Sequence, residues 1–167
     1  MPRNPSGIPM PDPLAYFITW TTYGTWLPGD ERGWVERPGR FRPANPRLQA
    51  AARSLLKEAP CELNAEERRV VEATIARHCR IRNWHLHIVN CRTRHVHVVV
   101  TAPVHPKIVR DQFKAWCTRH LKELQRARNT DGSQTVRVHW WTEGGSTRWL
   151  PDEESLVAAI HYVRDCQ

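Results

Sequence analysis

Two histidines, His95 and His97, are separated by one residue in a stretch whose pattern is that of a β-strand. Residues 95–100 combine polar and apolar alternation with valine, which is typical of a half-buried strand. Successive strand side chains point to opposite faces, so the two imidazoles share one face, about 7 Å apart. Two imidazoles at this spacing can share one metal ion. The alternative interpretation is a polar strand face with two solvated histidines.

The preceding segment, residues 84–90, alternates in the same way and predicts a second strand joined to the first by a short hairpin connection. If Leu86 and Ile88 face the core, His85 and His87 join the neighbouring histidine pair on the open face. A register slip of one residue would separate the two pairs. An all-imidazole set favours Zn²⁺, so a zinc-binding structural protein using these four histidines is one alternative function.

The elements around the histidine strand follow an alternating order of strands and helices. Caps and apolar periodicity predict helices that follow Asn45, Asn64, His105 and Asp152. Strands are predicted over residues 16–23, 84–90, 95–100 and 136–142, the last one continuing over 147–150 after a bend at two glycines. This order predicts a ferredoxin-like (RRM-like) α+β fold, an antiparallel sheet with helices on one face. The last helix, which bears Tyr162, would pack across the other face.

Composition and charge restrict the classes of partner. Lys and Arg outnumber Asp and Glu by 25 to 17, a net charge of +8 that favours a polyanion, nucleic acid first. Residues 1–13 carry five prolines and predict a flexible tail, and residues 14–167 are expected to form one domain. No apolar run could span a bilayer or serve as a secretory signal, so we expect a cytoplasmic protein without a membrane partner.

Cysteine usage excludes two further classes. The five cysteines are an odd number and include no Cys-x-x-Cys pair. This argues against a disulfide framework and against a thiolate zinc cluster.

Tryptophan and basic residues suggest where nucleic acid would bind. The irregular stretch 24–45 combines stacking and charged side chains, as in surfaces that bind single strands. Its alternative is an Ω-like loop pinned by its own tryptophans. Charges on the helix after His105 are either a solvated face or a phosphate-binding edge. The candidate DNA-binding residues are Trp26, Arg32, Trp34, Lys114, Arg119 and Arg148.

These features together resemble a known family. The His95-Val96-His97 strand with its preceding hairpin, the opening stretch 17–29 (FITWTTYGTWLPG), the stretch 141–150 (WTEGGSTRWL) and a tyrosine on the last helix are similar to the single-tyrosine HUH transposases. Within that family the chain resembles the insertion-sequence-200-like group and the REP-associated tyrosine transposases, over nearly its whole length from Tyr16.

The resemblance implies a metal-dependent transesterase that cleaves and rejoins single-stranded, hairpin-containing DNA through a 5′-phosphotyrosine. His95 and His97 would hold Mg²⁺ or Mn²⁺, and the enzyme would be a homodimer in which each site can take its tyrosine helix from the partner. Tyr16 and Tyr23 flank the first strand, so Tyr162 is the expected nucleophile.

Two positions depart from the family pattern. The family often carries a glutamine one helical turn after the tyrosine as a third metal ligand, and Cys166 stands there. Gln167 is the expected substitute, with Asp165 as the other oxygen donor. Arg94 precedes the histidine pair where relatives often have asparagine. A module that binds single-stranded nucleic acid without catalysis, as in a domesticated transposase, is the main competing interpretation.

Overall fold

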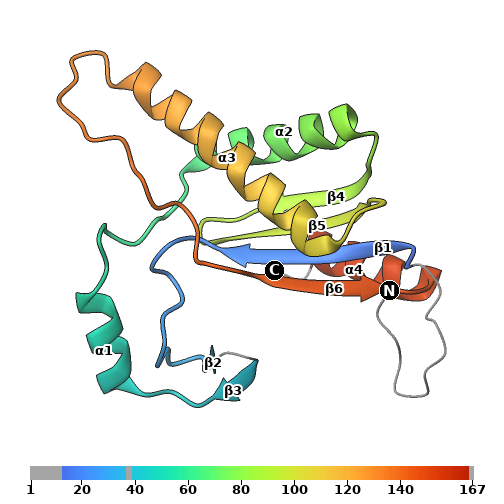
Figure 1. Ribbon diagram of the computed structural model, residues 1–167, viewed down its shortest axis with the longest axis horizontal. Coiled ribbons are helices and arrows are strands. Elements are labelled where there is room, and N and C mark those ends of the chain that lie inside the picture. Colours follow the sequence, from blue (N-terminus) through green and yellow to red (C-terminus); the bar gives the residue numbers. More distant parts are fainter. Residues whose placement is uncertain (1–12, 37–38, 166–167) are drawn as a thin grey trace.

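The structure of the protein is a computed structural model that describes residues 13–36 and 39–165. The predicted flexible tail therefore lies, except for Pro13, outside the described residues. The main sheet has the strand order β4-β5-β1-β6 with antiparallel pairing throughout (Figure 1). Its strands are β4 (His85–Cys91), β5 (His95–Thr101), β1 (Ala15–Thr21) and β6 (Ser146–Leu150).

Helices lie on both faces of this sheet. Two long helices, α2 (Ala65–Arg82) and α3 (Pro106–Arg128), pack together against one face, and the shorter α4 (Glu153–Asp165) lies against the other (Figure 1). The arrangement is the ferredoxin-like α+β fold, as the order of elements predicts.

Local sequence signals explain where the long helices begin and end. Asn64 caps α2 and forms a capping box with Glu67, whose side chain accepts from the Asn64 amide at 2.9 Å. Asn83 ends the same helix in the left-handed conformation, with φ at 55°. Pro106 occupies the first turn of α3, where its missing N–H leaves no hydrogen bond unmade. These signals fix the residues at which the two helices begin or end.

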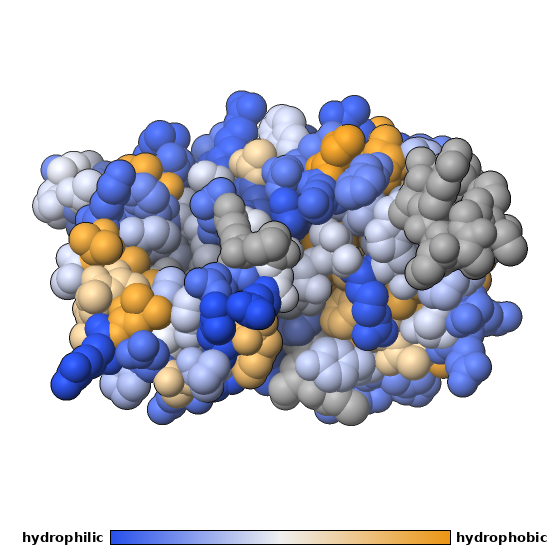
Figure 2. Space-filling view, turned by 60° about the horizontal axis from the view of Figure 1, so that its bottom comes forward, coloured by the Kyte–Doolittle hydropathy of each residue, from blue (hydrophilic) through white to orange (hydrophobic). Residues whose placement is uncertain are grey.

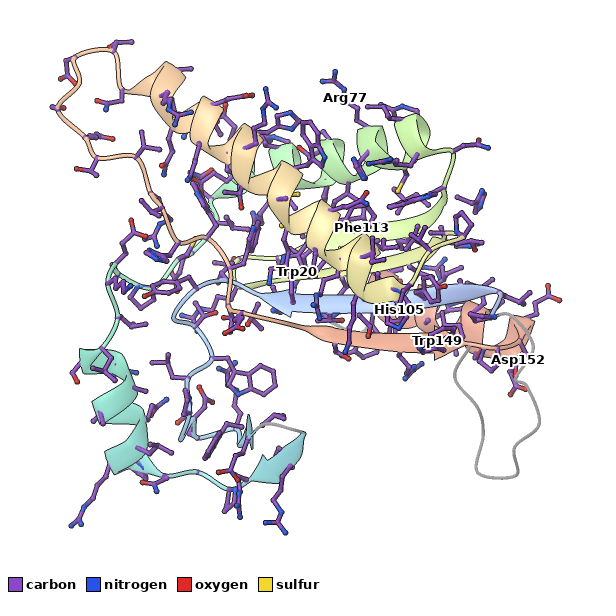
Figure 3. The ribbon with its side chains drawn as sticks, in the orientation of Figure 1. Trp20, Arg77, His105, Phe113, Trp149 and Asp152 are labelled. Carbon is purple, nitrogen blue, oxygen red and sulfur yellow. The ribbon has the colours of Figure 1, made fainter. Side chains whose placement is uncertain are left out.

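Alternation along the strands divides the apolar residues between two cores. Val96, Val98 and Val100 face α2 and α3, and on that side Trp20 points from β1 toward Phe113 of α3 (Figure 3). The opposite face has a smaller apolar core, which α4 covers. It consists of Ala15, Val99, Leu150, Ala159 and Val163.

The strand predicted over residues 136–142 is wrong apart from one bridge between Trp141 and Thr22, and its predicted continuation over residues 147–150 is confirmed as the edge strand β6, which begins at Ser146. Side chains accept the amides of residues 137–139, and only the end of the segment pairs with the backbone near the end of β1, where the Thr142 amide donates to Thr21 O at 3.0 Å. The Arg137 amide donates to Gln125 Oε1, and the Val138 and His139 amides donate to the Glu58 carboxylate at 2.9 and 2.6 Å. The segment has the alternating pattern of a strand, but over residues 137–139 side-chain oxygens accept the hydrogen bonds that a neighbouring strand would accept.

The stretch 24–45 forms a separate lobe beside the sheet. Its hairpin, β2 (Trp34–Glu36) and β3 (Arg40–Arg42), leads into α1 (Pro46–Ser54), away from the main sheet in Figure 1. Its tryptophans bind its own backbone, because Trp26 Nε1 donates to Gly33 O and Trp34 Nε1 to Pro43 O. The loop is therefore pinned by its own tryptophans.

Polar and charged residues cover most of the face seen in Figure 2, and the apolar patches on it are small and separate. No helix in the described part of the chain is long and apolar enough to cross a membrane.

Candidate active site

The histidine pair of β5 lies on the sheet face that carries α4. The ring centroids of His95 and His97 are 4.7 Å apart, with their planes at 90°. His97 is buried, and its partner across the strand pair β1–β5 is Thr19. The Thr19 hydroxyl lies 3.2 Å from His97 Nδ1. This contact orients the ring and leaves Nε2 to face another ligand.

The surroundings keep both imidazoles neutral near pH 7. Burial, together with the charges of His95 and Arg92, lowers the pKa of His97 to about 4. Burial also lowers the pKa of His95, together with the positive charges of Arg92 and Arg32. Neutral imidazole is the form that binds a metal ion. The nearby arginines would favour an anion such as phosphate at the same place.

Tyr162 stands beside this pair. Its ring centroid is 6.0 Å from that of His97, and its side chain is 45% exposed. The Phe17 ring forms a triangle with these two rings, stacked on His97 with centroids 5.8 Å apart and edge-on to Tyr162 at 5.9 Å. The Arg148 guanidinium lies over the Phe17 ring, 5.6 Å from its centroid. The chain thus brings a phenol, two imidazoles and a cation together on one surface.

The helix α4 that carries Tyr162 belongs to the same chain as the histidines and is held to the sheet by burial. Ala159 and Val163 are buried against Val99 and Leu150. In addition, Asn90 Nδ2 on β4 donates to Val163 O at 3.0 Å. Packing on one side of α4 leaves Tyr162 on its flank, turned toward the histidines.

The other two tyrosines are not available in the same way. Tyr16 is buried in the core beneath α2 and α3. The hydroxyl of Tyr23 accepts a hydrogen bond from the Lys57 amide at 2.9 Å. Of the three tyrosines, Tyr162 is the exposed one beside the histidine pair, and its role as the nucleophile stays a prediction.

The structure does not join the four histidines into one site. A β-bulge shifts the β4–β5 register between Leu86 and Ile88, and His87 is the residue left over. Because of this shift Ile88 pairs with Val99 under α4, instead of facing the core that Leu86 faces. His85 lies opposite Thr101, at the end of β5 far from His95. The expected four-histidine face is therefore corrected to two separate pairs.

The third metal ligand is not identified. Gln167, the expected ligand, and Cys166 lie outside the described residues. Asp165 is exposed and accepts two hydrogen bonds from Arg164. Among the residues that the structure describes, no three His, Cys, Asp or Glu side chains gather as a metal site. A cation at His95 and His97 would thus need water, DNA oxygens or the chain's last residues as its other ligands.

The candidate DNA-binding residues fall in different places. Arg32 lies over the Trp26 ring at 5.3 Å and pairs with Asp30 at 2.7 Å. Arg148 is at the tyrosine site, as described above. Lys114 is half-buried and donates to the carbonyls of residues 142 and 144. The remaining two lie apart, Trp34 in the β2–β3 hairpin and Arg119 over Trp116 on α3.

The residues that sequence reasoning missed are Thr19, Phe17 and Asn90. All three lie on the site face by strand parity and register. The alternation of β1 already separates Phe17 and Thr19 from the buried Ile18 and Trp20. That signal could have placed both residues with the histidines, once β1 and β5 were known to be neighbours.

Comparison with known proteins shows the fold. No protein-family profile and no curated protein matches the sequence. The structure of the REP-associated tyrosine transposase bound to a REP hairpin is similar with a TM-score of 0.52 and 10% identity, over 93% of this chain and 67% of that chain. A putative transposase from Deinococcus radiodurans R1 has a TM-score of 0.45 and 13% identity, over 99% of this chain and 97% of that chain. The chain therefore shares the fold of a tyrosine transposase.

Proposed function

We propose that the protein is a transposase of the single-tyrosine HUH type, a metal-dependent transesterase that acts on single-stranded DNA. The observation that carries the proposal is the placement of Tyr162 beside His97, with ring centroids 6.0 Å apart. The shared fold and the net charge of +8 support it.

The chemistry is a phosphoryl transfer to tyrosine. The Tyr162 oxygen forms a bond to phosphorus while the bond from phosphorus to the 3′ oxygen breaks. The phenol loses its proton and the departing 3′ oxygen gains one, which leaves a 5′-phosphotyrosine and a free 3′-hydroxyl. The reverse reaction with another 3′-hydroxyl would rejoin DNA without an external energy source.

His95 and His97 would hold the cation, Mg²⁺ or Mn²⁺, and the buried, neutral state of His97 fits that role. When bound, the cation supplies charge neutralisation and orientation at the scissile phosphate. Oxygen atoms of water and of the DNA phosphate would complete the coordination of either cation, and Mn²⁺ is the cation to test first. The residues of this chain supply the rest: Thr19 orients His97, and the Phe17 ring packs against both His97 and Tyr162.

Basic side chains would hold the DNA backbone. Arg148 lies over Phe17 at the site, and Arg92 and Arg32 are near enough to act on the histidine charges. Each can bind a phosphate oxygen with a charge-assisted hydrogen bond. By analogy with the REP hairpin bound to the similar structure, a single strand that contains a hairpin is the proposed substrate.

We propose further that the protein is a homodimer. Val35, Phe41 and Leu55 on the β2–β3 and α1 lobe are more than half exposed, and a second copy would cover them. The tyrosine site of one chain is assembled from its own α4, so dimerisation is not needed to bring Tyr162 to His97. Sedimentation of the protein tests the oligomeric state, and a monomer at all concentrations would refute the homodimer.

A cytoplasmic location of the protein stays a prediction.

Covalent trapping tests the proposed function. A pool of single-stranded DNA from the flanks of the gene, labelled at both ends, is incubated with protein and Mn²⁺, denatured, and examined for label that migrates with protein. The wild type should give an adduct, and Tyr162→Phe and His97→Ala should give none. Tyr16→Phe, which keeps the buried ring in the core on the other face of the sheet, is the matched control and should keep the adduct.

The outcome separates catalysis from binding alone. Salt-sensitive binding of these strands without any adduct would support the non-catalytic module instead. An adduct that survives Tyr162→Phe would leave the class of enzyme standing and refute the assignment of the nucleophile.

A further inference from the structure

A pocket of about 520 Å³ lies at the end of β1, outside the tyrosine site. Its volume is in the range of pockets that bind small organic groups, about 300–1,000 Å³. The walls come from the segment 23–28, the segment 138–143 and one face of α3. Much of its lining is aromatic: Tyr23, Trp26, His139, Trp140 and Trp141.

The aromatic rings in this pocket are held in place by their polar atoms. The Trp26 Nε1 atom donates to Gly33 O at 2.8 Å, and the Trp141 Nε1 atom donates to Thr118 Oγ1 at 3.0 Å. The Tyr23 ring lies against His139 with centroids 5.0 Å apart. Trp26 is nevertheless 40% exposed. Such rings present fixed apolar faces, and little conformational entropy is lost when a flat ligand stacks on them.

One polar group of the pocket is an ammonium. Lys114 Nζ donates to Thr142 O at 2.7 Å and to Gly144 O at 2.9 Å. An ammonium has three N–H donors, so one remains for a ligand. Burial lowers the pKa of Lys114 to about 8, and the charge of Arg110 acts in the same direction. The group is charged at neutral pH and would gain from an acceptor such as a carbonyl or ring nitrogen.

The pocket lies on the α3 side of the sheet, whereas the histidine pair faces α4, and two threonines connect the pocket wall to the end of the histidine strand. Thr21 lies opposite His95 in the β1–β5 register. The hydroxyl of Thr21 donates to that of Thr142 at 3.0 Å, and the Thr142 amide donates to Thr21 O at 3.0 Å. Thr142 also lines the pocket. Two strand spacings, about 10 Å, therefore separate the backbone of His95 from the pocket wall.

We propose that this pocket binds one unpaired base of the DNA strand whose phosphate lies at the histidine pair. The inference rests on the proposed function and goes beyond it, because it assigns a base-reading site. Flat rings for stacking, a buried donor for the base edge and a wall about 10 Å from His95 are the features that carry it. Arg32, which lies over the Trp26 ring without lining the pocket, supplies charge for the adjoining phosphate.

The test separates base contacts from backbone contacts. Fluorescence anisotropy compares two labelled strands of about twelve nucleotides, oligodeoxyadenylate and an abasic strand with the same phosphates, without metal and at fixed salt. Stacking of a base should make the wild type bind the adenine strand about tenfold more tightly. Trp26→Ala should remove most of that preference and leave the affinity for the abasic strand unchanged.

Two further variants control for the fold of the loop and for general stacking. Trp26→Phe keeps a ring but loses the hydrogen bond to Gly33, and it should keep most of the preference. Trp116→Ala is the matched control, because Trp116 is 39% exposed and also lies under an arginine, Arg119, at 5.3 Å. Trp116 does not line the pocket, so its loss should leave the preference unchanged.

Three results would overturn the inference. The wild type would bind both strands equally, Trp26→Ala would weaken both strands alike, or Trp116→Ala would remove the preference as fully as Trp26→Ala. None of these removes a covalent adduct at Tyr162. Failure of the proposed function would instead appear as the absence of that adduct, whatever the base preference.

Discussion

Asn90 of β4 donates a hydrogen bond from Nδ2 to the backbone oxygen of Val163, 3.0 Å away in the last turn of α4. The same asparagine lies opposite His97 in the β4–β5 register. The Asn90 side chain thus connects the position opposite His97, a candidate metal ligand, with the helix that carries Tyr162. The contact fixes the height of α4 over the sheet, and hence the distance from the phenol to the imidazole.

Replacement of Asn90 should therefore loosen the tyrosine helix without removing a metal ligand. Asn90→Ala loses a hydrogen bond with a net value of about 1 kcal/mol, so amides of α4 should exchange severalfold faster while those of α2 do not change. Asn90→Asp keeps the size but removes the donor, and it should behave alike. Hydrogen exchange read by mass spectrometry checks this, and equal α4 protection in wild type and both variants would contradict it.

Thr19 should matter for metal binding although it is not a ligand. Its hydroxyl, 3.2 Å from His97 Nδ1, orients the ring, and loss of such outer contacts typically weakens metal binding about 10- to 100-fold. Thr19→Val should weaken Mn²⁺ binding measured by calorimetry, and Thr19→Ser, which keeps the hydroxyl, should restore it. Equal Mn²⁺ affinity in Thr19→Val and wild type would show that the contact has no such role.

Glu58 should make the stability of the protein depend on pH. Burial raises the pKa of Glu58, but hydrogen bonds from the Val138 and His139 amides and the His139 ring outweigh this and lower the pKa to about 2. Because the folded pKa is below the ordinary value of 4.5, the stabilisation is complete above about pH 4.5 and disappears as the pH falls toward 2. Glu58→Gln should therefore lower the free energy of unfolding by about 2 kcal/mol at pH 7.

Urea unfolding at several pH values measures this effect. The difference between wild type and Glu58→Gln should shrink steadily below pH 4.5. Glu62→Gln is the control, since its ion pair with Arg94 is more than half exposed and worth little. A difference for Glu58→Gln that stays constant down to pH 3 would contradict the assignment.

The bulge at His87 predicts that the two histidine pairs act independently. His87→Ala should leave Mn²⁺ and Zn²⁺ affinity unchanged, because His87 Nε2 contacts Thr101 Oγ1 at 2.8 Å, away from the other pair. His97→Ala should abolish the tight binding of a metal ion at the pair formed by His95 and His97. Metal titration of both variants decides the point, and a joint loss of one stoichiometric zinc would favour the four-histidine alternative.

Most of the fold follows from signals that are local in the sequence. The caps at Asn45 and Asn64 and proline at residue 106 place three helix starts where the structure has them. The alternation in residues 95–100 gives the strand and the face of its histidines. Each of these signals lies within one continuous segment, so it can be recognised in the sequence without knowing which segments pair.

What could not be predicted depends on pairing between segments. The bulge at His87 arises only where β4 meets β5, and it moves Ile88 to the other face of the sheet. Residues 136–142 alternate like a strand, yet side chains from elsewhere in the chain, Glu58 and Gln125, accept the amides of residues 137–139. The contact of Thr19 with His97 likewise needs the β1–β5 register.

The most direct measurement of the central claim locates the DNA adduct on the chain. After reaction with a cleavable strand and Mn²⁺, nuclease and trypsin digestion followed by mass spectrometry should find a nucleotide on the peptide 149–164, attached to Tyr162. This result would establish the phenol beside His97 as the nucleophile. A nucleotide on Tyr23 or on any other residue, with the peptide 149–164 unmodified, would contradict the account.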